Sequence, residues 1–455
     1  MNATASPSTP DTSSALRRGL SLRHILFIAL GSAIGTGLFY GSASAISLAG
    51  PSVLLAYMIG GAAVFMVMRA MGQMALAHPV SGAFSEYATR YLGPWAGFTT
   101  GWTYAFEMAL VAIADVTAFA VYMQFWFPSS PAWVWIGVVL LLIMAINLVQ
   151  IKAFGESEFW FTTIKVGAII AMIAGGIVLM LVGTQSVAGN TASITNLWSH
   201  GGFFPHGIAG FVACFTVVMF AFGGIETIGI AAGEAENPQV SIPKAVNTTP
   251  VRILLFYVLA LTVIMSLIPW SQIQGQSSPF VQIFSALGIP AAAHILNFVV
   301  LTAAVSAINA DVYGAGRMLY GLAQQKMAPQ TFTRTAKNGV PYMTVVCTGL
   351  VLIVGVFVNV FFENAFLVVA SLATFATVMV WVMILLSHIA FARKSQHNVS
   401  SRGSYVALAF MAFIVLQFAF FADTRLALVV GSIWCVFLGV FYVTFVKKNQ
   451  GSSLL

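Results

Sequence analysis

Hydrophobic residues fill long runs along most of the chain, and short polar segments separate these runs. A run of about 20 apolar residues is the length that crosses a lipid bilayer as one helix. The pattern therefore predicts an all-α polytopic membrane protein with twelve spans, at residues 24–48, 52–72, 96–126, 133–151, 158–183, 208–231, 251–270, 289–312, 341–360, 364–390, 404–422 and 426–446.

Two further segments carry helical predictions of their own. Residues 80–93 are more polar than the spans around them, so we expect a short helix at the membrane interface before the third span. The run 290–325 is longer than a bilayer requires, and its helix is expected to continue into the following loop. Neither segment changes the predicted number of spans.

The first span contains the stretch Gly31-Ser32-Ala33-Ile34-Gly35-Thr36-Gly37, which places three glycines in seven residues at mid-membrane depth. We expect the helix to break here, which is tolerable only where a buried cavity or a ligand satisfies the released backbone groups. The half-helix that begins near Gly35 would offer N–H groups to a carboxylate, and the preceding half-helix would offer carbonyls to an ammonium. The alternative is that the small residues serve only close helix packing. The predicted substrate-binding residues here are Ser32, Ala33, Gly35, Thr36 and Gly37.

The sixth span carries a second glycine-rich interruption, at residues 220–226 (FAFGGIE). Spans 1 and 6 are the first members of two five-span sets, 1–5 and 6–10. Paired interruptions at corresponding positions are typical of an inverted-repeat transporter that binds its substrate between the broken helices. We expect Phe222 to act as a gate and Glu226 to cap released N–H groups. The predicted lining residues are Ala221, Phe222, Gly223 and Glu226.

Composition and charge agree with a membrane protein. Hydrophobic residues make up 59% of the 455 residues and charged residues 7%, and the mean hydropathy is +0.94. The net charge of +7 reflects topology and not a nucleic acid partner, because every Lys and Arg except Lys165 and Arg425 falls on the side that holds both termini. Basic residues concentrate on cytoplasmic segments, so both termini are predicted to be cytoplasmic.

The predicted organisation has five parts: a disordered cytoplasmic tail (1–22), a first repeat with spans 1–5 (23–183), a second repeat with spans 6–10 (208–390), spans 11 and 12 (404–447), and a short cytoplasmic tail (448–455). The three cysteines lie in apolar runs without metal-ligand spacing, and the sequence contains no phosphate-binding loop or nucleophile motif. The sequence therefore predicts no metal or cofactor, and it disfavours a membrane enzyme, a nutrient sensor and an ATP-driven pump.

Four motifs point to a family: GSAIGTGLF at residues 31–39, FGGIE at 222–226, GEAENP at 233–238 with IPKA at 242–245, and GRMLY at 316–320. Through these motifs the chain resembles the amino acid transporter family within the amino acid–polyamine–organocation permeases, and the resemblance extends from residue 16 to about residue 447. The resemblance implies a leucine-transporter-type fold, in which twelve helices form a 5+5 inverted repeat with broken helices 1 and 6. It also implies secondary active import of an L-amino acid by proton symport.

Within this family the chain is most similar to bacterial permeases assigned to histidine or to proline. The expected location is therefore a bacterial cytoplasmic (inner) membrane, in which the protein is multi-pass. Two alternatives are kept: uptake of proline or another neutral amino acid, and exchange of one amino acid for another without net proton movement. The predicted partners are an amino acid, protons and the lipid bilayer, with the oligomeric state open.

Two acidic residues lie in the third span, Glu107 and Asp115, with Val111 between them. Charged groups inside a bilayer are costly and usually face a cavity or a partner. Glu107 and Val111 are predicted to line the substrate pocket, whereas Asp115 matches an acidic position that is common in the family. A carboxylate at Glu107 favours a substrate side chain that donates hydrogen bonds, which ranks histidine above proline. The alternative for both acids is a structural hydrogen bond to a neighbouring helix.

Lys165 is the only basic residue deep within a predicted span. The resemblance implies that its ammonium replaces a sodium ion of sodium-coupled relatives, between carbonyls of span 1 and span 8. Proton coupling is accordingly assigned to Lys165, Glu226 and Asp115. The alternative role for Lys165 is a permanently charged strut between spans 5 and 1.

Span 8 presents a polar face, because Ser306 and Asn309 are one helical turn apart. Asn309 is predicted to contribute to substrate binding. Asp311 stands where the family often has a small residue, so its role is open, and an ion pair with Arg317 near the cytoplasmic surface is one interpretation.

Overall fold

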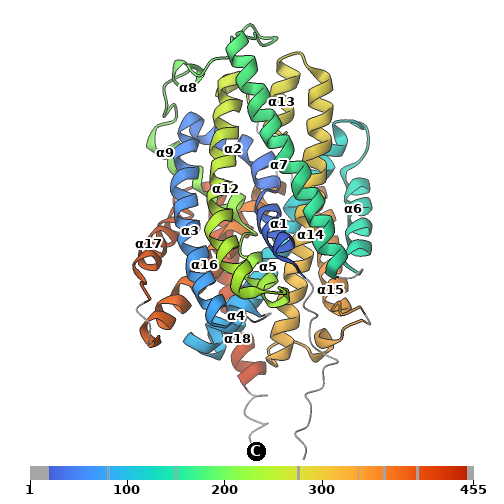
Figure 1. The fold of residues 1–455 in the computed structure, drawn as a ribbon, viewed down its shortest axis with the longest axis vertical. Coiled ribbons are helices and arrows are strands. Elements are labelled where there is room, and N and C mark those ends of the chain that lie inside the picture. Colours follow the sequence, from blue (N-terminus) through green and yellow to red (C-terminus); the bar gives the residue numbers. More distant parts are fainter. Residues whose placement is uncertain are drawn as a thin grey trace, which may run out of the picture.

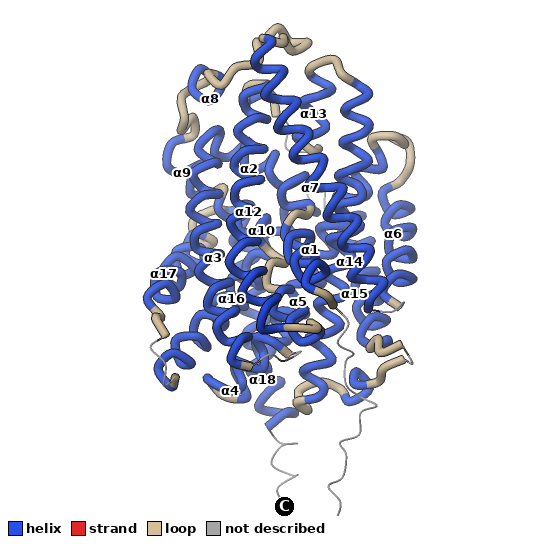
Figure 2. Tube along the Cα trace, viewed as in Figure 1, coloured by secondary structure: helices blue, strands red, loops and turns tan. Residues whose placement is uncertain are grey.

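The computed structural model describes residues 20–78, 80, 82–148, 151–273, 277–336, 338–361, 365–395 and 399–447. The predicted tails, 1–22 and 448–455, lie almost entirely outside these residues. The described residues form helices and loops, and their only β-pairing consists of isolated bridges (Figure 2). The prediction of an all-α fold is therefore confirmed for the described part of the chain.

Within the described residues, ten long helices make up most of the bundle in Figure 1. They are α3 (Val53–Ala77), α5 (Pro94–Gln124), α6 (Ala132–Asn147), α7 (Ile151–Val182), α12 (Pro238–Leu267), α14 (Pro290–Gln324), α15 (Tyr342–Phe361), α16 (Ala365–Lys394), α17 (Arg402–Gln417) and α18 (Ala422–Phe441). The shorter helices include α4 (Ala83–Leu92), α8 (Asn196–Ser199) and α13 (Pro279–Ala286). The short helix predicted within 80–93 and the long continuation of the helix within 290–325 are both present.

The two predicted breaks are also present. The first predicted span consists of α1 (Leu22–Ala33), a bend at residues 34–35, the π-helical turn η2 (Gly37–Gly41) and α2 (Ser42–Ala49). The sixth consists of α9 (Gly207–Ala213), α10 (Phe215–Phe222), a non-helical turn and α11 (Thr227–Ala231). Both predicted spans are thus interrupted at their glycine-rich segments.

Eight stretches of the described chain are long and apolar enough to cross a membrane, and three shorter apolar helices occur at Ala132–Asn147, Tyr342–Gly355 and Arg402–Gln417. One of the eight, Leu22–Ala77, contains the two predicted spans that α1 to α3 form. These findings support a polytopic membrane protein, whereas the number of twelve spans and the 5+5 repeat stay predictions.

Two helices begin clearly earlier than the sequence predicts. The seventh span was expected to begin at residue 251, but α12 begins at Pro238. The fifth span was expected to begin at residue 158, but α7 begins at Ile151. Glu156 therefore belongs to the helix and not to the preceding loop, and Glu158 lies within the helix and not at its first residue. Hydropathy places the start too late because it cannot distinguish a polar helical turn from a polar loop.

α5 forms the centre of the bundle, where it packs along α14 and α16. At the periphery, α7 and α18 expose apolar side chains such as Leu181, which is 83% exposed, and Val436, which is 68% exposed. Apolar faces of this kind are what lipid covers in a membrane protein. The polar residues of the site, including Lys165 and Glu158 on α7, are instead buried inside the bundle.

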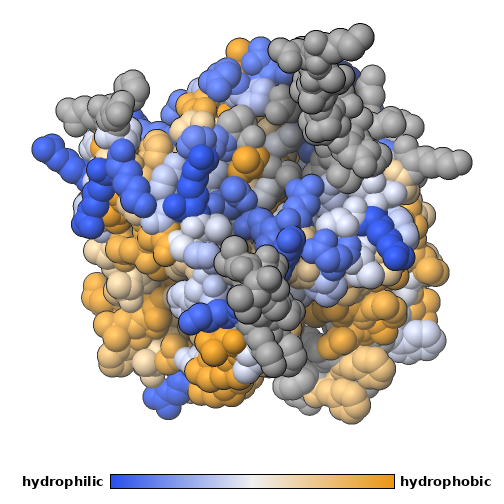
Figure 3. All heavy atoms as spheres, turned by 90° about the horizontal axis from the view of Figure 1, so that it is seen from below, coloured by the Kyte–Doolittle hydropathy of each residue, from blue (hydrophilic) through white to orange (hydrophobic). Residues whose placement is uncertain are grey.

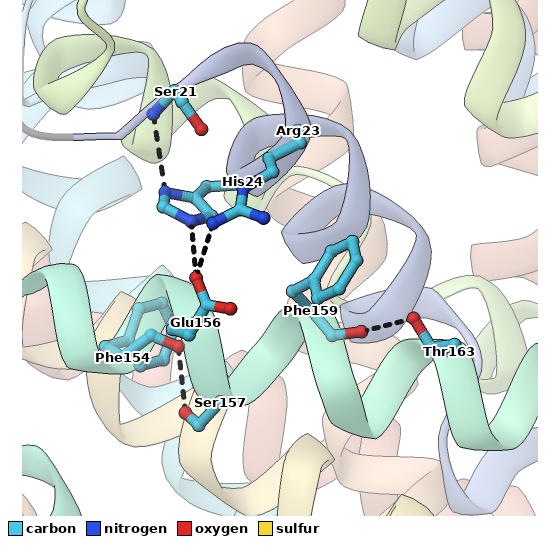
Figure 4. A network of polar contacts seen from close by, with 8 residues as sticks. All are labelled: Ser21, Arg23, His24, Phe154, Glu156, Ser157, Phe159 and Thr163. Atoms are coloured by element: carbon cyan, nitrogen blue, oxygen red, sulfur yellow. Dashed lines mark hydrogen bonds and ion pairs between the residues drawn. The ribbon is translucent and has the colours of Figure 1, made fainter.

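The two ends of the bundle are named here after the helices that mark them in Figure 1, the α4 end and the α13 end. Figure 3 looks onto the α4 end of the bundle. Hydrophilic residues cover much of this face, and hydrophobic residues lie near its edge. At this end Arg23 Nη2 donates a hydrogen bond to Glu156 Oε2 at 2.7 Å, and His24 Nε2 lies 3.3 Å from the same oxygen (Figure 4). These contacts tie α1 to α7.

A second set of contacts closes the same end. Leu20 donates its N–H to the carbonyl of Glu234 at 3.1 Å and accepts a bond from the N–H of Glu236 at 3.0 Å. Arg317 Nε lies 3.1 Å from Glu234 Oε1, and both side chains are almost fully buried. The residues before α1, the segment after α11 and helix α14 are therefore linked at the α4 end.

Candidate functional site

The two breaks lie against each other at the centre of the bundle. A Cβ atom added to Gly37 would lie 2.5 Å from Cα of Ala221, and one added to Gly224 would lie 3.0 Å from the carbonyl oxygen of Ser32. Gly224 also has a φ of +87°, a conformation that favours glycine. Close helix packing and a broken backbone, which were alternative readings of these glycines, therefore occur together.

The carbonyls at the end of α1 have partners from two other helices. Lys165 Nζ donates to the carbonyl of Gly31 at 2.6 Å and to that of Ile34 at 3.0 Å. The hydroxyl of Tyr257, on α12, lies 2.5 Å from the carbonyl oxygen of Ala33 and 2.8 Å from that of Ala221. The ammonium of Lys165 thus lies at span 1 carbonyls, where the resemblance places it.

Glu158 completes this part of the site, and sequence reasoning missed it. Its carboxylate accepts hydrogen bonds from Ser306 Oγ at 2.7 Å and from Asn309 Nδ2 at 2.9 Å. It also interacts electrostatically with Lys165, which lies two helical turns further along α7. The available signal was an acidic residue seven positions before the intramembrane lysine, a spacing that puts both side chains on one helix face.

Asn309 belongs to the same network. Its amide donates to Glu158, and its Oδ1 accepts a bond from Asn147 Nδ2 at 2.8 Å. The side chain therefore connects α14 to α6 and α7. These hydrogen bonds do not test whether Asn309 binds the substrate, so that role stays a prediction.

Asp115 meets the first break directly. The hydroxyl of Thr36 donates a hydrogen bond to Asp115 Oδ1, and both side chains are buried. The carboxyl group of Asp311, on α14, lies beside that of Asp115. The interpretation that Asp311 pairs with Arg317 is wrong, because Arg317 pairs with Glu234 and its guanidinium lies over the ring of Tyr313.

Glu226 caps the second break, as expected from its position. Its Oε1 accepts the N–H of Gly224 at 3.1 Å, and its Oε2 accepts the indole N–H of Trp381 at 3.1 Å. Trp381 lies on α16 and is fully buried. Sequence reasoning did not identify this tryptophan, because its span contains many other aromatic and apolar residues.

Glu107 faces the same region from α5. Its Oε1 accepts a hydrogen bond from the hydroxyl of Thr377 at 2.7 Å, and the Glu226 carboxyl lies beside it. Its Oε2 is buried and has no hydrogen-bonded donor among the described residues. Thr377 and Trp381 are one turn apart on α16, so this helix supplies partners to both acids.

The remaining predicted residues lie in tight packing. Phe222 is 1% exposed, and its ring stacks on Tyr257 with 5.4 Å between centroids. Val111 is 9% exposed on α5, and Gly35 faces α14, where an added Cβ would lie 3.2 Å from Cβ of Ala307. A Cβ on Gly223 would lie 3.1 Å from the carbonyl oxygen of Phe220. The roles of these residues in gating and substrate binding stay predictions.

Comparison with known proteins identifies the family of the chain. The family model for amino acid permeases matches residues 24–452. The chain is 47% identical over 451 residues to the uncharacterized amino acid permease YtnA of Bacillus subtilis (strain 168), covering 96% of this chain and 97% of that protein. It is 43% identical over 452 residues to the D-serine/D-alanine/glycine transporter of Escherichia coli (strain K12), covering 96% of each.

A third relative is named for the transport of aromatic amino acids. The chain is 45% identical over 438 residues to the aromatic amino acid transport protein AroP of Escherichia coli O6:H1, covering 94% of this chain and 95% of that protein. The match to the family model extends over nearly the whole chain, and each of these identities extends over nearly the whole of both proteins. Together they show that the chain belongs to the amino acid permease family of the amino acid–polyamine–organocation superfamily.

Proposed function

We propose that this permease imports an L-amino acid together with a proton across the bacterial cytoplasmic membrane, with histidine as its preferred substrate. The observation that carries the proposal is the contact of Lys165 with two carbonyls of the broken first span. Lys165 can release and regain a proton, and it binds the broken first span, which is expected to bind the substrate. Protonation and substrate binding act on the same break.

The balance of buried charge supports proton coupling. Among the described residues around the breaks, Lys165 is the only buried base. Uncompensated charges in a low-dielectric interior are strongly unfavourable. Some of the acids therefore hold protons or receive a cation from the substrate. The buried acids of this region are Glu107, Asp115, Glu158, Glu226 and Asp311.

Transport in proteoliposomes tests the coupling. Uptake should require an inward proton gradient, and Lys165→Ala should retain binding and counterflow exchange but lose gradient-driven accumulation. The matched control is Lys244→Ala, which removes an exposed lysine from α12 and should leave accumulation unchanged. A Lys165→Ala protein that still concentrates substrate would contradict the coupling role. Loss of binding and exchange together would instead identify Lys165 as a strut.

The preference for histidine rests on Glu107. Its buried Oε2 has no donor among the described residues, and an imidazole N–H can supply one. The apolar side chain of proline offers no donor. Competition of each standard amino acid against labelled histidine tests this ranking, and stronger competition by proline than by unlabelled histidine would overturn it.

A second candidate substrate class is small neutral amino acids. It is favoured by the relative named as a D-serine/D-alanine/glycine transporter, which is 43% identical to this chain. Including D-serine, D-alanine and glycine in the competition assay distinguishes this class from histidine. Uptake that does not depend on the proton gradient, but requires an amino acid inside the vesicle, would identify an exchanger.

A further inference from the structure

We propose that a cavity at the α13 end is an entry site, which holds the zwitterionic amino acid before it reaches the broken helices. This inference rests on the proposed transport function. The cavity has a volume of about 320 Å³ and lies where α5, α12, α13 and α14 meet. That volume is at the lower end of the range for small-molecule sites. Its polar lining includes Tyr122, Gln272, Ser278, Gln282, Ser285 and Asn297.

The lining suits a small zwitterion. None of the described residues that line the cavity is charged, and the polar ones carry hydroxyl or amide groups. Hydroxyl and amide groups both donate and accept hydrogen bonds, so they can contact an ammonium and a carboxylate alike. Val121, Phe125 and Val281 add an apolar wall for the side chain. Uncharged partners also favour a site that releases its ligand quickly, because the strongest hydrogen bonds are those between charged groups.

Two buried hydroxyl groups in the lining have no hydrogen-bond partner among the residues that the structure describes. They belong to Tyr122 and Ser278, each of which is 2% exposed. Ser278 is the residue before α13, yet its side chain does not cap that helix. A buried hydroxyl without a partner is energetically unfavourable, because it loses its bonds to water and gains none in the protein. A polar ligand in the cavity would supply the missing partners to both groups.

The cavity lies on the route to the first break. Tyr122 contacts the ring of Tyr40 with 6.1 Å between centroids, and Tyr40 contacts Phe366 at 4.6 Å. Tyr40 belongs to η2, which directly follows the break. Asp115, the partner of Thr36, is seven residues before Tyr122, about 10 Å along α5. An aromatic layer therefore separates the cavity from the broken helix, and the ion pairs described above close the opposite end.

Protection of an engineered thiol tests the entry site. Cys214, Cys347 and Cys435 are first replaced by alanine in the full chain, and Ser285→Cys then places one thiol at the exposed rim of the cavity. L-histidine, L-phenylalanine and glycine are the probes. At least one of them should slow modification by a membrane-impermeant thiol reagent. Ser199→Cys on α8, which is exposed outside the cavity, is the matched control and should show no slowing.

The decisive comparison adds Gly35→Val, which is expected to abolish binding at the break. Protection of Ser285→Cys should persist in this background, because the cavity binds the ligand by itself. Two results overturn the proposal: no protection by any probe in the parental background, or protection that disappears with Gly35→Val. The second result would show that the thiol reports occupancy of the central site.

A second variant does not depend on the folding of Gly35→Val. Ser285→Trp fills the cavity and should lower kcat/KM for uptake about tenfold, whereas Ser199→Trp should leave it unchanged. Unchanged uptake by Ser285→Trp would overturn the entry site. Gradient-driven uptake by the parental protein is measured in the same vesicles. If the entry-site tests fail while parental uptake is normal, the proposed function still stands. If the parental protein shows no uptake, the proposed function itself is refuted.

Discussion

Gly37 packs directly against the second break. Its missing side chain lets η2 approach the backbone of α10, because an added Cβ would lie 2.5 Å from Cα of Ala221. Gly35 has more room, since its nearest obstacle is the Cβ of Ala307 at 3.2 Å. The two glycines should therefore differ in their tolerance of substitution, although they are two positions apart.

Gly37→Ala is expected to destabilise the protein by about 1–3 kcal/mol and to impair uptake, because backbone atoms of α10 cannot move aside. Gly35→Ala should have a smaller effect, since its contact at 3.2 Å is relieved by a shift of a few tenths of an ångström between the bend at residues 34–35 and α14. Thermal unfolding in detergent and uptake in vesicles measure both. Gly137→Ala on α6, where an added Cβ meets nothing within 4 Å, is the control. A Gly37→Ala protein as stable as this control would contradict the packing argument.

Glu107→Gln is expected to reduce the preference for histidine over proline, because a neutral amide attracts a donor N–H less strongly than a carboxylate does. The ratio of inhibition constants for the two amino acids measures this change. Glu86→Gln on α4 removes an acid outside the site and should leave the ratio unchanged. If Glu107→Gln also leaves the order of substrates unchanged, this residue does not select histidine.

At the scale of elements, two ion pairs at the α4 end differ in burial. Arg317 and Glu234 link α14 to the segment after α11, with side chains 3% and 2% exposed. Arg23 and Glu156 link α1 to α7, with side chains 55% and 40% exposed. Loss of one partner leaves an uncompensated buried charge in the first pair, whereas water replaces the missing partner in the second.

Arg317→Gln should therefore destabilise the protein by about 3–5 kcal/mol, and Arg23→Gln by about 0–1 kcal/mol. The difference in melting temperature between the two variants measures the contrast. Replacement of both Arg317 and Glu234 by neutral residues should recover part of the loss, because no unpaired charge then remains. Equal melting temperatures for the two single variants would contradict this prediction.

The elements of the site differ in how far sequence predicts them. The breaks follow from local composition, because glycine clusters such as 31–37 and 223–224 stand out within apolar runs. The cap by Glu226 follows in the same way, since acid and break are two residues apart. The partners of Glu158 do not, because Ser306 and Asn309 lie about 150 residues away on α14. Such contacts depend on how distant helices pack, which hydropathy does not contain.

Residues with ordinary side chains were the hardest to predict. Tyr257 and Trp381 make central contacts with the carbonyls and with Glu226, yet both look like packing residues in the sequence. Thr377 donates to Glu107 from a helix otherwise dominated by apolar residues. In each of these residues a single polar atom makes a hydrogen bond to a neighbouring helix, and the fold determines which helix is near enough.

At the scale of the whole molecule, the two ends of the bundle are closed by different interactions. Ion pairs and the backbone hydrogen bonds of Leu20 hold the α4 end, whereas an aromatic layer with Tyr40 and Phe366 lies below the cavity at the α13 end. Aromatic contacts are worth about 0.5–1.5 kcal/mol beyond their burial, which is less than a buried ion pair costs to break. The α13 end should therefore open more easily than the α4 end.

The burial of Lys165 has an electrical consequence. A zwitterionic substrate carries no net charge, so a proton that enters with it through this lysine moves one elementary charge across the membrane in each cycle. A potential of 100 mV then contributes about 2.3 kcal/mol, which corresponds to a roughly 50-fold concentration ratio. Addition of a neutral amino acid to proteoliposomes should produce an inward current that Lys165→Ala lacks. An exchanger of neutral amino acids moves no net charge and would produce no current. Voltage can therefore drive uptake by this permease only if a proton travels with the substrate.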